Sequence, residues 1–254
     1  MFKILTLNTW QERGPWKLRW ELILKGIQSL EPDVIAFQEV FNPDWAREVK
    51  KKSGYPFLVF HPERSGLMFL SQHTVVESLC HTFAEKSPTE DYSRYALFAE
   101  IKIGKKKINF LNTHLSWKPE EYATRERQIS ELLKFMKFRE SENKSESSVL
   151  VGDFNAPPSA PEIQRFIKEA KVTDAFAALF PDVKGFTWNN ENPYIRNCSH
   201  PMPDRRIDYV FFKNVENHLG PLEKAELVLN RPTSTGIWPS DHFGLLASFN
   251  ERKL

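Results

Sequence analysis

Polar side chains that could do chemistry follow or end short apolar segments along the whole chain. They are Asn8, Glu39, His114, Asp153, Asn155, Asp208, Asp241 and His242. Carboxylate and amide oxygens are the ligands that hard cations such as Mg²⁺ and Mn²⁺ prefer. Two histidines beside such a cation suit anion binding and proton transfer. Together these residues favour a site for a phosphate ester, where a cation offsets charge on the oxygens and a carboxylate orients water.

Taken alone, each of these residues also has a structural interpretation. Asn8 suits a turn, because asparagine tolerates left-handed backbone and bonds its own chain. Asp153 could cap a helix, and Asp208 could pair with Arg205 or Arg206. Other hydrolytic sites lack their signatures in this sequence. It contains no Gly-x-Ser-x-Gly elbow and no Gly-rich phosphate loop, which disfavours a serine hydrolase and a nucleotide-binding P-loop.

Two strand–helix–strand units are expected to position the polar residues. The first unit comprises a strand at Phe2–Leu7, an amphipathic helix at Lys17–Leu30 and a buried strand at Val34–Gln38. The second comprises a strand that ends at His114, a helix at Glu120–Phe138 and a strand at Val149–Val151. Both units contain a strand that ends Leu-Asn-Thr, so we interpret them as a weak internal duplication. Strand ends in layered α/β sheets are where sites are built.

The rest of the chain extends this α/β pattern. Residues 57–115 are strand-like, and further strands are expected at Ile207–Phe212, Ala225–Leu229 and Leu245–Phe249. The string Ser159-Ala160-Pro161-Glu162 predicts a capping box that opens a third helix. The polar stretch Glu140–Ser147 predicts a loop. No composition break resembles a linker, so residues 1–254 are expected to form a single domain.

Composition limits the class of protein. The chain has 254 residues, 41% of them hydrophobic, and a formal net charge of +2, which excludes a strongly basic nucleic-acid coat protein. Cys80 and Cys198 are too few for a disulfide framework or a zinc cluster, so two reduced thiols are expected. The N-terminus lacks a signal-peptide core, and no apolar run is long enough to cross a membrane. These features predict a cytoplasmic protein, which we expect to be a monomer.

Six short strings together resemble a known family. They are Leu7-Asn8-Thr9-Trp10, Gln38-Glu39-Val40, Asn112-Thr113-His114-Leu115, Gly152-Asp153-Phe154-Asn155, Arg206-Ile207-Asp208-Tyr209 and Ser240-Asp241-His242. They occur in the order typical of the endonuclease/exonuclease/phosphatase superfamily, and they span nearly the whole chain. The resemblance implies a four-layer α/β sandwich, with two mixed β-sheets packed face to face and helices outside. The closest-looking branches are the tyrosyl-DNA phosphodiesterases and the neutral sphingomyelinases.

The resemblance also implies roles for the polar residues. Glu39 would be the principal ligand of Mg²⁺, for which Mn²⁺ would substitute, with Asn8 beside it and Asp241 supporting the metal region. Asp153 would activate water, and Asn155 and His114 would contact the phosphate. His242 would stabilise the transition state, oriented by Asp208. Some nucleases carry an aspartate where this chain has Trp10.

Aromatic residues near the motifs suggest how a substrate is chosen. Four tryptophans and one arginine are candidate substrate-binding residues: Trp10, Trp117, Trp188, Trp238 and Arg206. The tryptophans could simply cover the core edge, or they could stack on bases of single-stranded nucleic acid. The sequence therefore predicts a metal-dependent phosphodiesterase acting on DNA or nucleotide ends. The alternatives are a sphingomyelinase-like, inositol or phospholipid phosphodiesterase or phosphatase that binds a lipid head group, and a non-catalytic scaffold with the same fold.

Overall fold

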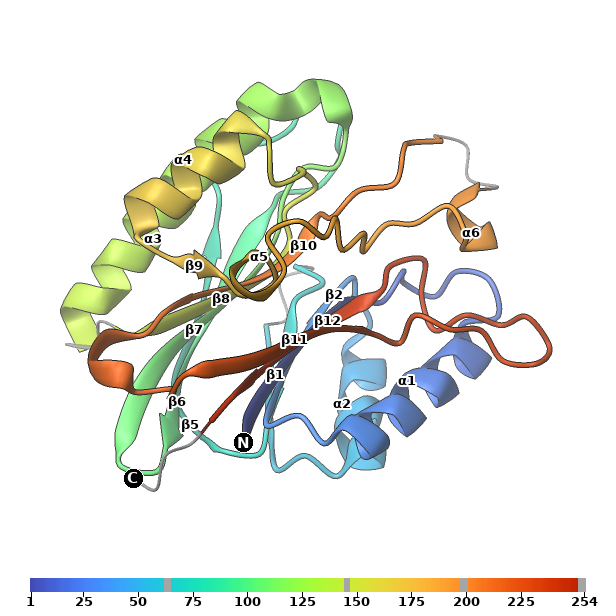
Figure 1. Ribbon diagram of the computed structural model, residues 1–254, viewed down its shortest axis with the longest axis horizontal. Helices are drawn as coiled ribbons and strands as arrows, with labels where there is room; N and C mark the ends of the chain where they lie inside the picture. The colour runs from blue at the N-terminus through green and yellow to red at the C-terminus, as the bar shows by residue number, and fades with distance from the viewer. Residues whose placement is uncertain (62–64, 144–146, 197–200, 251–254) are drawn as a thin grey trace.

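Two mixed six-stranded β-sheets pack face to face at the centre of the computed structural model, which describes residues 1–61, 65–143, 147–196 and 201–250 (Figure 1). Cys198 lies outside the described residues. In spatial order the first sheet contains β11 (Leu222–Val228), β12 (Gly244–Phe249), β1 (Phe2–Asn8), β2 (Val34–Gln38), β4 (Met68–Ser71) and β3 (Phe57–Phe60). The second contains β5 (Thr74–Thr82), β6 (Tyr95–Ile103), β7 (Lys106–His114), β8 (Ser148–Asp153), β10 (Asp208–Lys213) and β9 (Thr173–Asp174).

Helices cover the outer face of each sheet, so the molecule has four layers (Figure 1). On one side lie α1 (Trp16–Leu30) and α2 (Pro43–Ser53), and on the other α3 (Tyr122–Asn143) and α4 (Pro161–Ala170). Short helices α5 (Ala175–Leu179) and α6 (Pro193–Arg196) and two 3₁₀ turns, Pro119–Glu121 and Val215–Asn217, lie in the connections. This arrangement confirms the predicted four-layer α/β sandwich.

The two sheets repeat one arrangement. β1 and β2 are parallel and are joined through α1. β7 and β8 are also parallel and are joined through the 3₁₀ turn Pro119–Glu121 and α3. Each parallel pair is flanked by antiparallel strands, β12 and β4 in one sheet and β6 and β10 in the other. Parallel strands expose their carboxyl ends at one edge, and both pairs end in the polar motifs.

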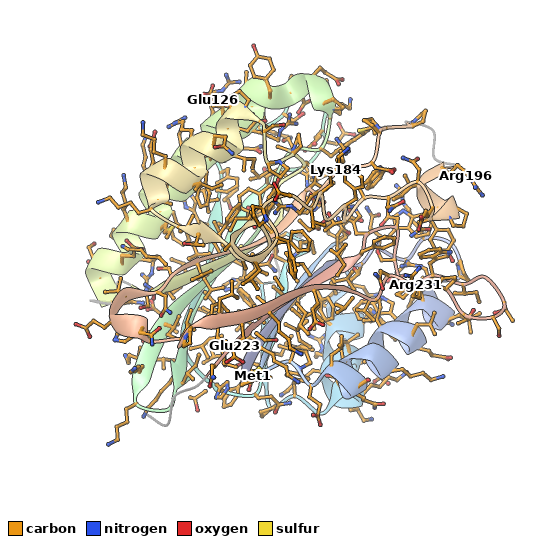
Figure 2. The ribbon with its side chains drawn as sticks, viewed as in Figure 1. Met1, Glu126, Lys184, Arg196, Glu223 and Arg231 are labelled. Carbon is orange, nitrogen blue, oxygen red and sulfur yellow. The ribbon has the colours of Figure 1, made fainter. Side chains whose placement is uncertain are left out.

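Apolar side chains fill the space between the sheets and beneath the helices (Figure 2). Ile4, Ala99 and Val151 are completely buried between the sheets. Leu132 faces the core beneath α3, whereas Glu126 lies on the outward side of that helix (Figure 2). This amphipathic division explains why the helices pack on the sheets rather than standing free in solvent.

A polar bridge crosses the interface between the sheets, among the apolar side chains that fill it. The Gln38 side-chain amide donates to Asn112 Oδ1 at 2.8 Å, and the Asn112 amide donates to the carbonyls of Phe37 at 2.9 Å and Met68 at 3.2 Å. Both side chains are completely buried. Because the Asn112 side chain reaches Gln38, Phe37 and Met68 of the other sheet only in the correct alignment, this bridge favours one register of the two sheets.

Two local predictions are wrong. The stretch Glu140–Ser147 is not wholly a loop, because α3 continues to Asn143; residues 144–146 lie outside the described part. The polar side chains of this last turn are paired with the neighbouring sheet. Arg139 pairs with Glu77 on β5, and Glu140 accepts bonds from Ser148 and Lys213 at 3.0 and 3.3 Å. Tertiary pairing therefore extends a helix that polarity alone would end.

The predicted capping box is also absent. α4 begins at Pro161 after Ala160, whose side chain makes no cap bond, and Glu162 pairs with Arg125 of α3 at 3.1 Å instead. α2 was not among the predicted helices. Asn42 caps that helix by accepting the backbone N–H of Asp44 and Trp45, a signal that was readable in the sequence.

Candidate active site

The strand ends bring the motif residues together at one edge of the sandwich. Asn8 ends β1, and Glu39 directly follows β2, which runs parallel to it. In the second sheet, His114 at the end of β7 lies in register with Asp153 at the end of β8. β10 runs antiparallel to β8, so its first residue, Asp208, lies opposite Asp153. The sheet register itself thus assembles the site from segments far apart in sequence.

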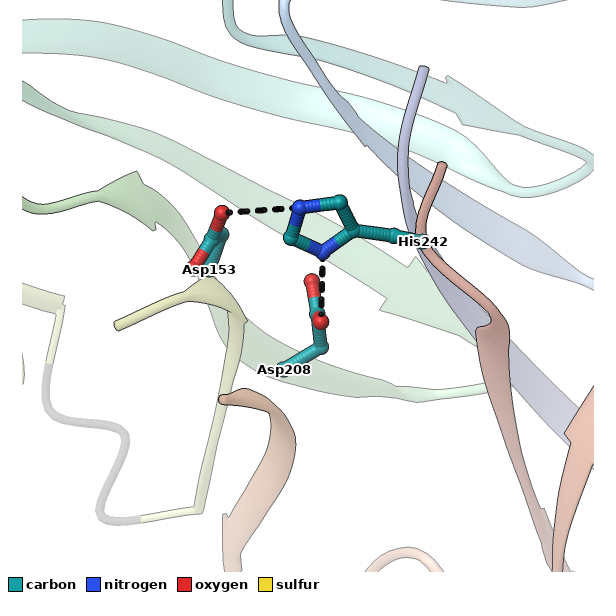
Figure 3. Close-up of side chains that lie close together, drawn as sticks. All are labelled: Asp153, Asp208 and His242. Atoms are coloured by element: carbon teal, nitrogen blue, oxygen red, sulfur yellow. Dashed lines mark hydrogen bonds and ion pairs between the residues drawn. The ribbon is translucent and has the colours of Figure 1, made fainter. Parts of the chain in front are cut away.

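The His242 imidazole lies between two carboxylates (Figure 3). Its Nδ1 is 2.8 Å from Asp208 Oδ2, and its Nε2 is 3.8 Å from Asp153 Oδ2. Burial alone would lower the pKa of His242, but Asp208, Asp241 and Asp153 together raise it to about 10. His242 is therefore an imidazolium at neutral pH, fixed in orientation by Asp208.

Asp153 is the most connected group of the site. Its Oδ2 accepts the Asn8 side-chain amide at 3.0 Å and lies 3.4 Å from His114 Nε2, and its Oδ1 accepts the backbone N–H of Asn155 at 2.9 Å. Burial and the nearby Asp208 raise the pKa of Asp153 to about 6. A carboxylate with that pKa can take a proton from water near neutral pH.

His114 is neutral under the same conditions. Burial, the Arg94 guanidinium and His242 hold the pKa of His114 well below its usual range. A neutral imidazole can donate a hydrogen bond to an oxygen without bringing a second charge. His114 and His242 therefore differ in charge within one pocket.

Glu39 and Asp241 form an acidic corner beside this group. Burial raises the pKa of both carboxyls, that of Asp241 to about 6, and Glu39 itself contributes to the rise at Asp241. The Glu39 carboxylate accepts the Asn8 amide at 3.4 Å, and Asp241 accepts the Ser240 hydroxyl at 3.2 Å. Neighbouring carboxylates that repel one another fit a divalent cation, which would offset their charge with oxygen ligands.

A second set of ligand atoms is less suitable for a cation. Asp153, Asp208 and His242 place one ligand atom each within 4.8 Å of one another. The imidazole, however, already occupies the space between the two carboxylates and is held as a cation there. A metal ion between His242 and either carboxylate would have to displace the imidazole proton that faces it. The corner at Glu39 is therefore the better candidate for a metal site.

Arg19 anchors the loop that follows β1. Its side chain is completely buried and donates to the backbone carbonyls of Thr9, Trp10, Gln11, Arg13 and Pro239. The guanidinium also lies over the Trp10 ring, 4.9 Å from its centroid. The Trp10 ring in turn stacks on Tyr194 at 4.6 Å. One buried cation thus fixes the backbone and the aromatic wall on this side of the site.

The site opens into a pocket of about 690 Å³. Its lining includes seven of the eight motif residues, the exception being Asp208, which lies behind His242. Aromatic and basic side chains complete the wall: Trp10, Tyr92, Trp117, Trp188, Tyr194, Arg13 and Arg205. The volume suits a small organic group or a nucleotide rather than a bare ion.

Not all of the predicted substrate-binding residues reach this pocket. Trp10, Trp117 and Trp188 line it, but Trp238 is buried and stacks on Phe243 at 5.7 Å. Arg206 is buried and pairs with Asp174 at 2.6 Å. The structure places neither Trp238 nor Arg206 in the lining.

Arg205, next to Arg206, lines the pocket instead. Its guanidinium lies over the Trp188 ring, 5.5 Å from the centroid, and the two residues exchange backbone hydrogen bonds of 2.9 Å. Trp188 also packs edge-on against His242 at 5.0 Å. Arg205 adjoins the motif at Asp208, and this adjacency already makes it a candidate for phosphate contact from the sequence. Tyr92 and Tyr194 were not predicted as wall residues.

No helix within the described residues is long and apolar enough to cross a membrane.

Comparisons with known proteins match both the sequence and the shape. The pattern that defines the Endonuclease/Exonuclease/phosphatase family matches residues 5–242. Mouse tyrosyl-DNA phosphodiesterase 2 is 28% identical over 86% of this chain, which spans 58% of that relative's length. Two crystal structures have TM-scores of 0.78 over 98% of this chain: D. rerio TDP2 complexed with a single-strand DNA product, 20% identical over 98% of its chain, and sphingomyelinase C from Streptomyces griseocarneus, 18% identical over 99%.

Proposed function

The chain belongs to the endonuclease/exonuclease/phosphatase family, and from that we propose that it is a divalent-metal-dependent phosphodiesterase acting on DNA or nucleotide ends. One observation carries the proposal. The line Asp208–His242–Asp153 faces an acidic corner at Glu39 inside a pocket with aromatic walls. Hydrolysis of a phosphate ester needs a general base, a fixed positive charge and a site for a divalent metal ion. Asp153, the His242 imidazolium and the acidic corner at Glu39 fit these three needs. We further propose that residues 1–254 act as one catalytic domain in the cytoplasm.

In this proposal Glu39, with Asn8 and Asp241, holds Mg²⁺ or Mn²⁺. When bound, the cation would offset charge on the phosphate oxygens. Asp153 takes a proton from the attacking water, which its raised pKa allows near neutral pH. The His242 imidazolium faces the charge that develops on the phosphate, and Asp208 holds the ring in place.

Two further residues hold the phosphate. The Asn155 side-chain amide donates one N–H to the Leu115 carbonyl at 3.0 Å, which fixes the amide and leaves its second N–H for a phosphate oxygen. His114, kept neutral and 3.4 Å from Asp153, donates a second bond to the phosphate. Fixed donors aimed at developing charge are the main source of catalysis at such sites.

The aromatic wall supports a nucleic-acid substrate. The stacked pair Trp10–Tyr194 and the pair Arg205–Trp188 present flat faces on which bases can stack. Arg13 and Arg205 add positive charge for neighbouring phosphates. The name of the mouse relative points to the same class of substrate.

A substrate panel tests the proposal. The wild-type protein is incubated with Mg²⁺, Mn²⁺ or a chelator and with single- and double-stranded DNA, 5′-phosphotyrosyl DNA, sphingomyelin or inositol phosphates. We expect cleavage of DNA substrates with either cation and none with the chelator. Metal-independent cleavage would contradict the proposed chemistry. Cleavage confined to sphingomyelin or inositol phosphates would instead support the lipid or inositol branch.

A further inference from the structure

A buried arginine holds the loop that follows each of two strands ending at the site. Arg19 binds the loop after β1, and Arg125 binds the loop after β7. Each arginine is the fourth residue of its helix, α1 or α3, and comes eleven residues after the last residue of the preceding strand, Asn8 or His114. The two halves of the molecule thus repeat an arginine as well as an arrangement of strands.

The Arg125 side chain binds three backbone carbonyls of one short loop. Its Nη1 donates to Ser116 at 3.2 Å and to Lys118 at 2.6 Å, and its Nη2 donates to Pro119 at 3.2 Å. The side chain is 5% exposed, and its Nε pairs with Glu162 of α4 at 3.1 Å. Because buried backbone carbonyls need partners, and these partners are reached only along this path, Arg125 fixes the conformation of the loop.

Trp117 lies at the centre of this loop. The two carbonyls that Arg125 Nη1 binds belong to the residues on either side of it. Its own backbone N–H donates to Glu90 at 3.1 Å, and the N–H of Ser116 donates to Gln128 at 3.1 Å. Trp117 is half-buried and lines the active-site pocket. The direction in which its ring leaves the backbone is therefore set by side chains that do not line the pocket.

Arg19 has the same relation to Trp10. It donates to the backbone carbonyls of Thr9, Trp10 and Gln11, and Trp10 lines the same pocket. An arginine can bind several carbonyls at once, because its five N–H donors form a rigid planar fork. Two aromatic residues of the pocket wall are thus held by two buried arginines at matching places in the fold.

The neighbouring His114 is positioned by different contacts. It lies in register with Asp153 in the sheet, and the N–H of Leu115 donates to the Asp153 carbonyl at 2.9 Å. The strand therefore places the imidazole, whereas Arg125 places the tryptophan. Loosening the loop should weaken substrate binding more than it slows the chemical step.

We propose that Arg125 is a positioning residue that holds Trp117 in the pocket wall as a fixed stacking surface for a nucleic-acid base. This inference rests on the proposed phosphodiesterase function and deepens it, because it gives a residue outside the pocket a role in substrate binding. A ring that is held before the substrate arrives loses little freedom when a base stacks on it. Arg125 therefore adds to affinity without touching the nucleotide.

Arg125→Lys tests this role, because it keeps the positive charge and removes the fork. Steady-state kinetics with Mg²⁺ compare a single-stranded oligonucleotide with a small chromogenic diester that has no bases. We expect KM for the oligonucleotide to rise about tenfold, within the range for one lost base stack. The kcat for the oligonucleotide and kcat/KM for the small diester should each stay within about twofold of the wild-type values.

Arg127→Lys is the matched control on the same helix. The Arg127 side chain is 58% exposed and pairs with Glu85 at 2.6 Å, and it does not line the pocket. It should keep the wild-type KM for the oligonucleotide.

A double-mutant cycle with Trp117→Ala separates positioning of the ring from a general effect on the fold. If Arg125 acts through Trp117, then Arg125→Lys should raise KM for the oligonucleotide by less than about twofold once the ring is absent. If Arg125→Lys fails to fold, as thermal unfolding would show, Glu162→Gln takes its place. That variant removes the ion pair but keeps an acceptor for Arg125 Nε, so it should give a smaller rise in KM of the same kind.

The outcomes separate the two proposals. An unchanged KM for the oligonucleotide, an equal loss with the small diester, or additive losses in the double variant would overturn the role of Arg125 while leaving the phosphodiesterase in place. Failure of the wild-type protein to cleave the oligonucleotide or any diester with Mg²⁺ or Mn²⁺ would overturn the proposed function itself.

Discussion

At the scale of single residues, the contacts of His242 and Asp153 explain how one pocket holds an acid form and a base form side by side. Asp208 lies 2.8 Å from the imidazole and stabilises its charged form, while burial keeps part of the Asp153 population protonated near pH 6. Pairs of titratable groups with pKa values pushed in opposite directions are typical of acid–base sites. Neither value is encoded by residue type, because both depend on burial and on neighbours from other strands.

Removing either group should reduce turnover far more than stability. Asp153→Asn removes the base and His242→Ala the fixed cation, so each should lower kcat by about 10²–10⁴-fold. Asp208→Asn should cost less than His242→Ala, because it only weakens the orientation of the ring. Steady-state kinetics and thermal unfolding measure the two effects. Asp182→Asn, an exposed aspartate outside the pocket, is the control, and near-wild-type turnover in Asp153→Asn would show that the base is misassigned.

Metal binding should depend on pH through the same carboxylates. Without a cation, burial raises the pKa of Asp153 and Asp241 to about 6, from an ordinary value of 3.8. Because these folded-state pKa values lie above the unfolded ones, the charged carboxylates lower the free energy of unfolding. This destabilisation is complete above about pH 6 and is lost as the pH falls towards 4. A cation that relieves it should therefore raise Tm by several degrees at about pH 8 and by much less at about pH 5, where protons compete for the ligands.

Thermal unfolding with and without Mg²⁺ across this range measures the effect. Glu39→Gln should shrink the shift at the higher pH, whereas Glu21→Gln should not. A Mg²⁺-induced shift as large at about pH 5 as at about pH 8 would contradict a carboxylate site for the cation.

At the scale of elements, the loops at one edge of the sheets decide what enters the pocket. The strand ends supply groups that suit any phosphate ester, so selectivity must come from the wall. The wall residues Trp10, Tyr194, Trp188 and Arg205 come from the loop after β1, from α6 and from the segment before β10. These side chains belong to two separate connections, β1 to α1 and α5 to β10, and they meet only in the folded molecule.

Truncating the wall tryptophans should separate binding from chemistry. If the substrate is DNA, Trp117→Ala and Trp188→Ala should each weaken oligonucleotide binding by about 1–3 kcal/mol, as for a lost base stack. Hydrolysis of a small chromogenic diester without bases should change little. Fluorescence titration with an oligonucleotide and a diester assay measure the two effects.

Trp238→Ala is the matched control, because Trp238 stacks on Phe243 outside the pocket. It should lower stability and leave oligonucleotide affinity unchanged. Normal binding in the pocket variants would remove the support that the aromatic wall gives to a nucleic-acid substrate.

Sequence patterns predicted where the strands end. They did not predict to which face each side chain of the connecting segments points. Arg205 and Arg206 show the reason. Neighbouring residues of an extended chain point to opposite faces, so one of the two arginines turns outward to Trp188 and the other inward to Asp174. Which one does so depends on the pairing of Trp188 with Arg205, a contact that no local pattern specifies. The polar end of α3 was mispredicted for a related reason, since its partners lie on β5, β8 and β10.

At the scale of the whole molecule, the site depends on how the two sheets are aligned. Asn8 and Glu39 belong to one sheet and His114, Asp153 and Asp208 to the other, so a shift between the sheets would pull the site apart. Packing of apolar faces fixes such an alignment only loosely, because hydrophobic contact has no direction. The bridge from Gln38 to Asn112 supplies a directional contact next to the site.

A double-mutant cycle measures that bridge. Gln38→Leu should cost about 1–3 kcal/mol in the free energy of unfolding, because it leaves buried Asn112 Oδ1 without its donor. Asn112→Leu should cost a similar amount, and the double variant should be more stable than the sum of the two losses predicts by about 1 kcal/mol. Denaturant unfolding gives all of these values. Simple additivity would mean that the bridge contributes nothing to the alignment.

The buried guanidinium of Arg19 has a consequence for the timing of site assembly. Because it binds the carbonyls of two segments far apart in sequence, from Thr9 to Arg13 and at Pro239, this wall takes its final shape when α1 docks on the sheet. The conformational entropy of these loops is then lost during folding and not when substrate arrives, which leaves more of the contact energy available for affinity. Such preorganisation means that the wall cannot open as a lid without releasing a buried charge, so substrates must enter through a mouth that is already formed.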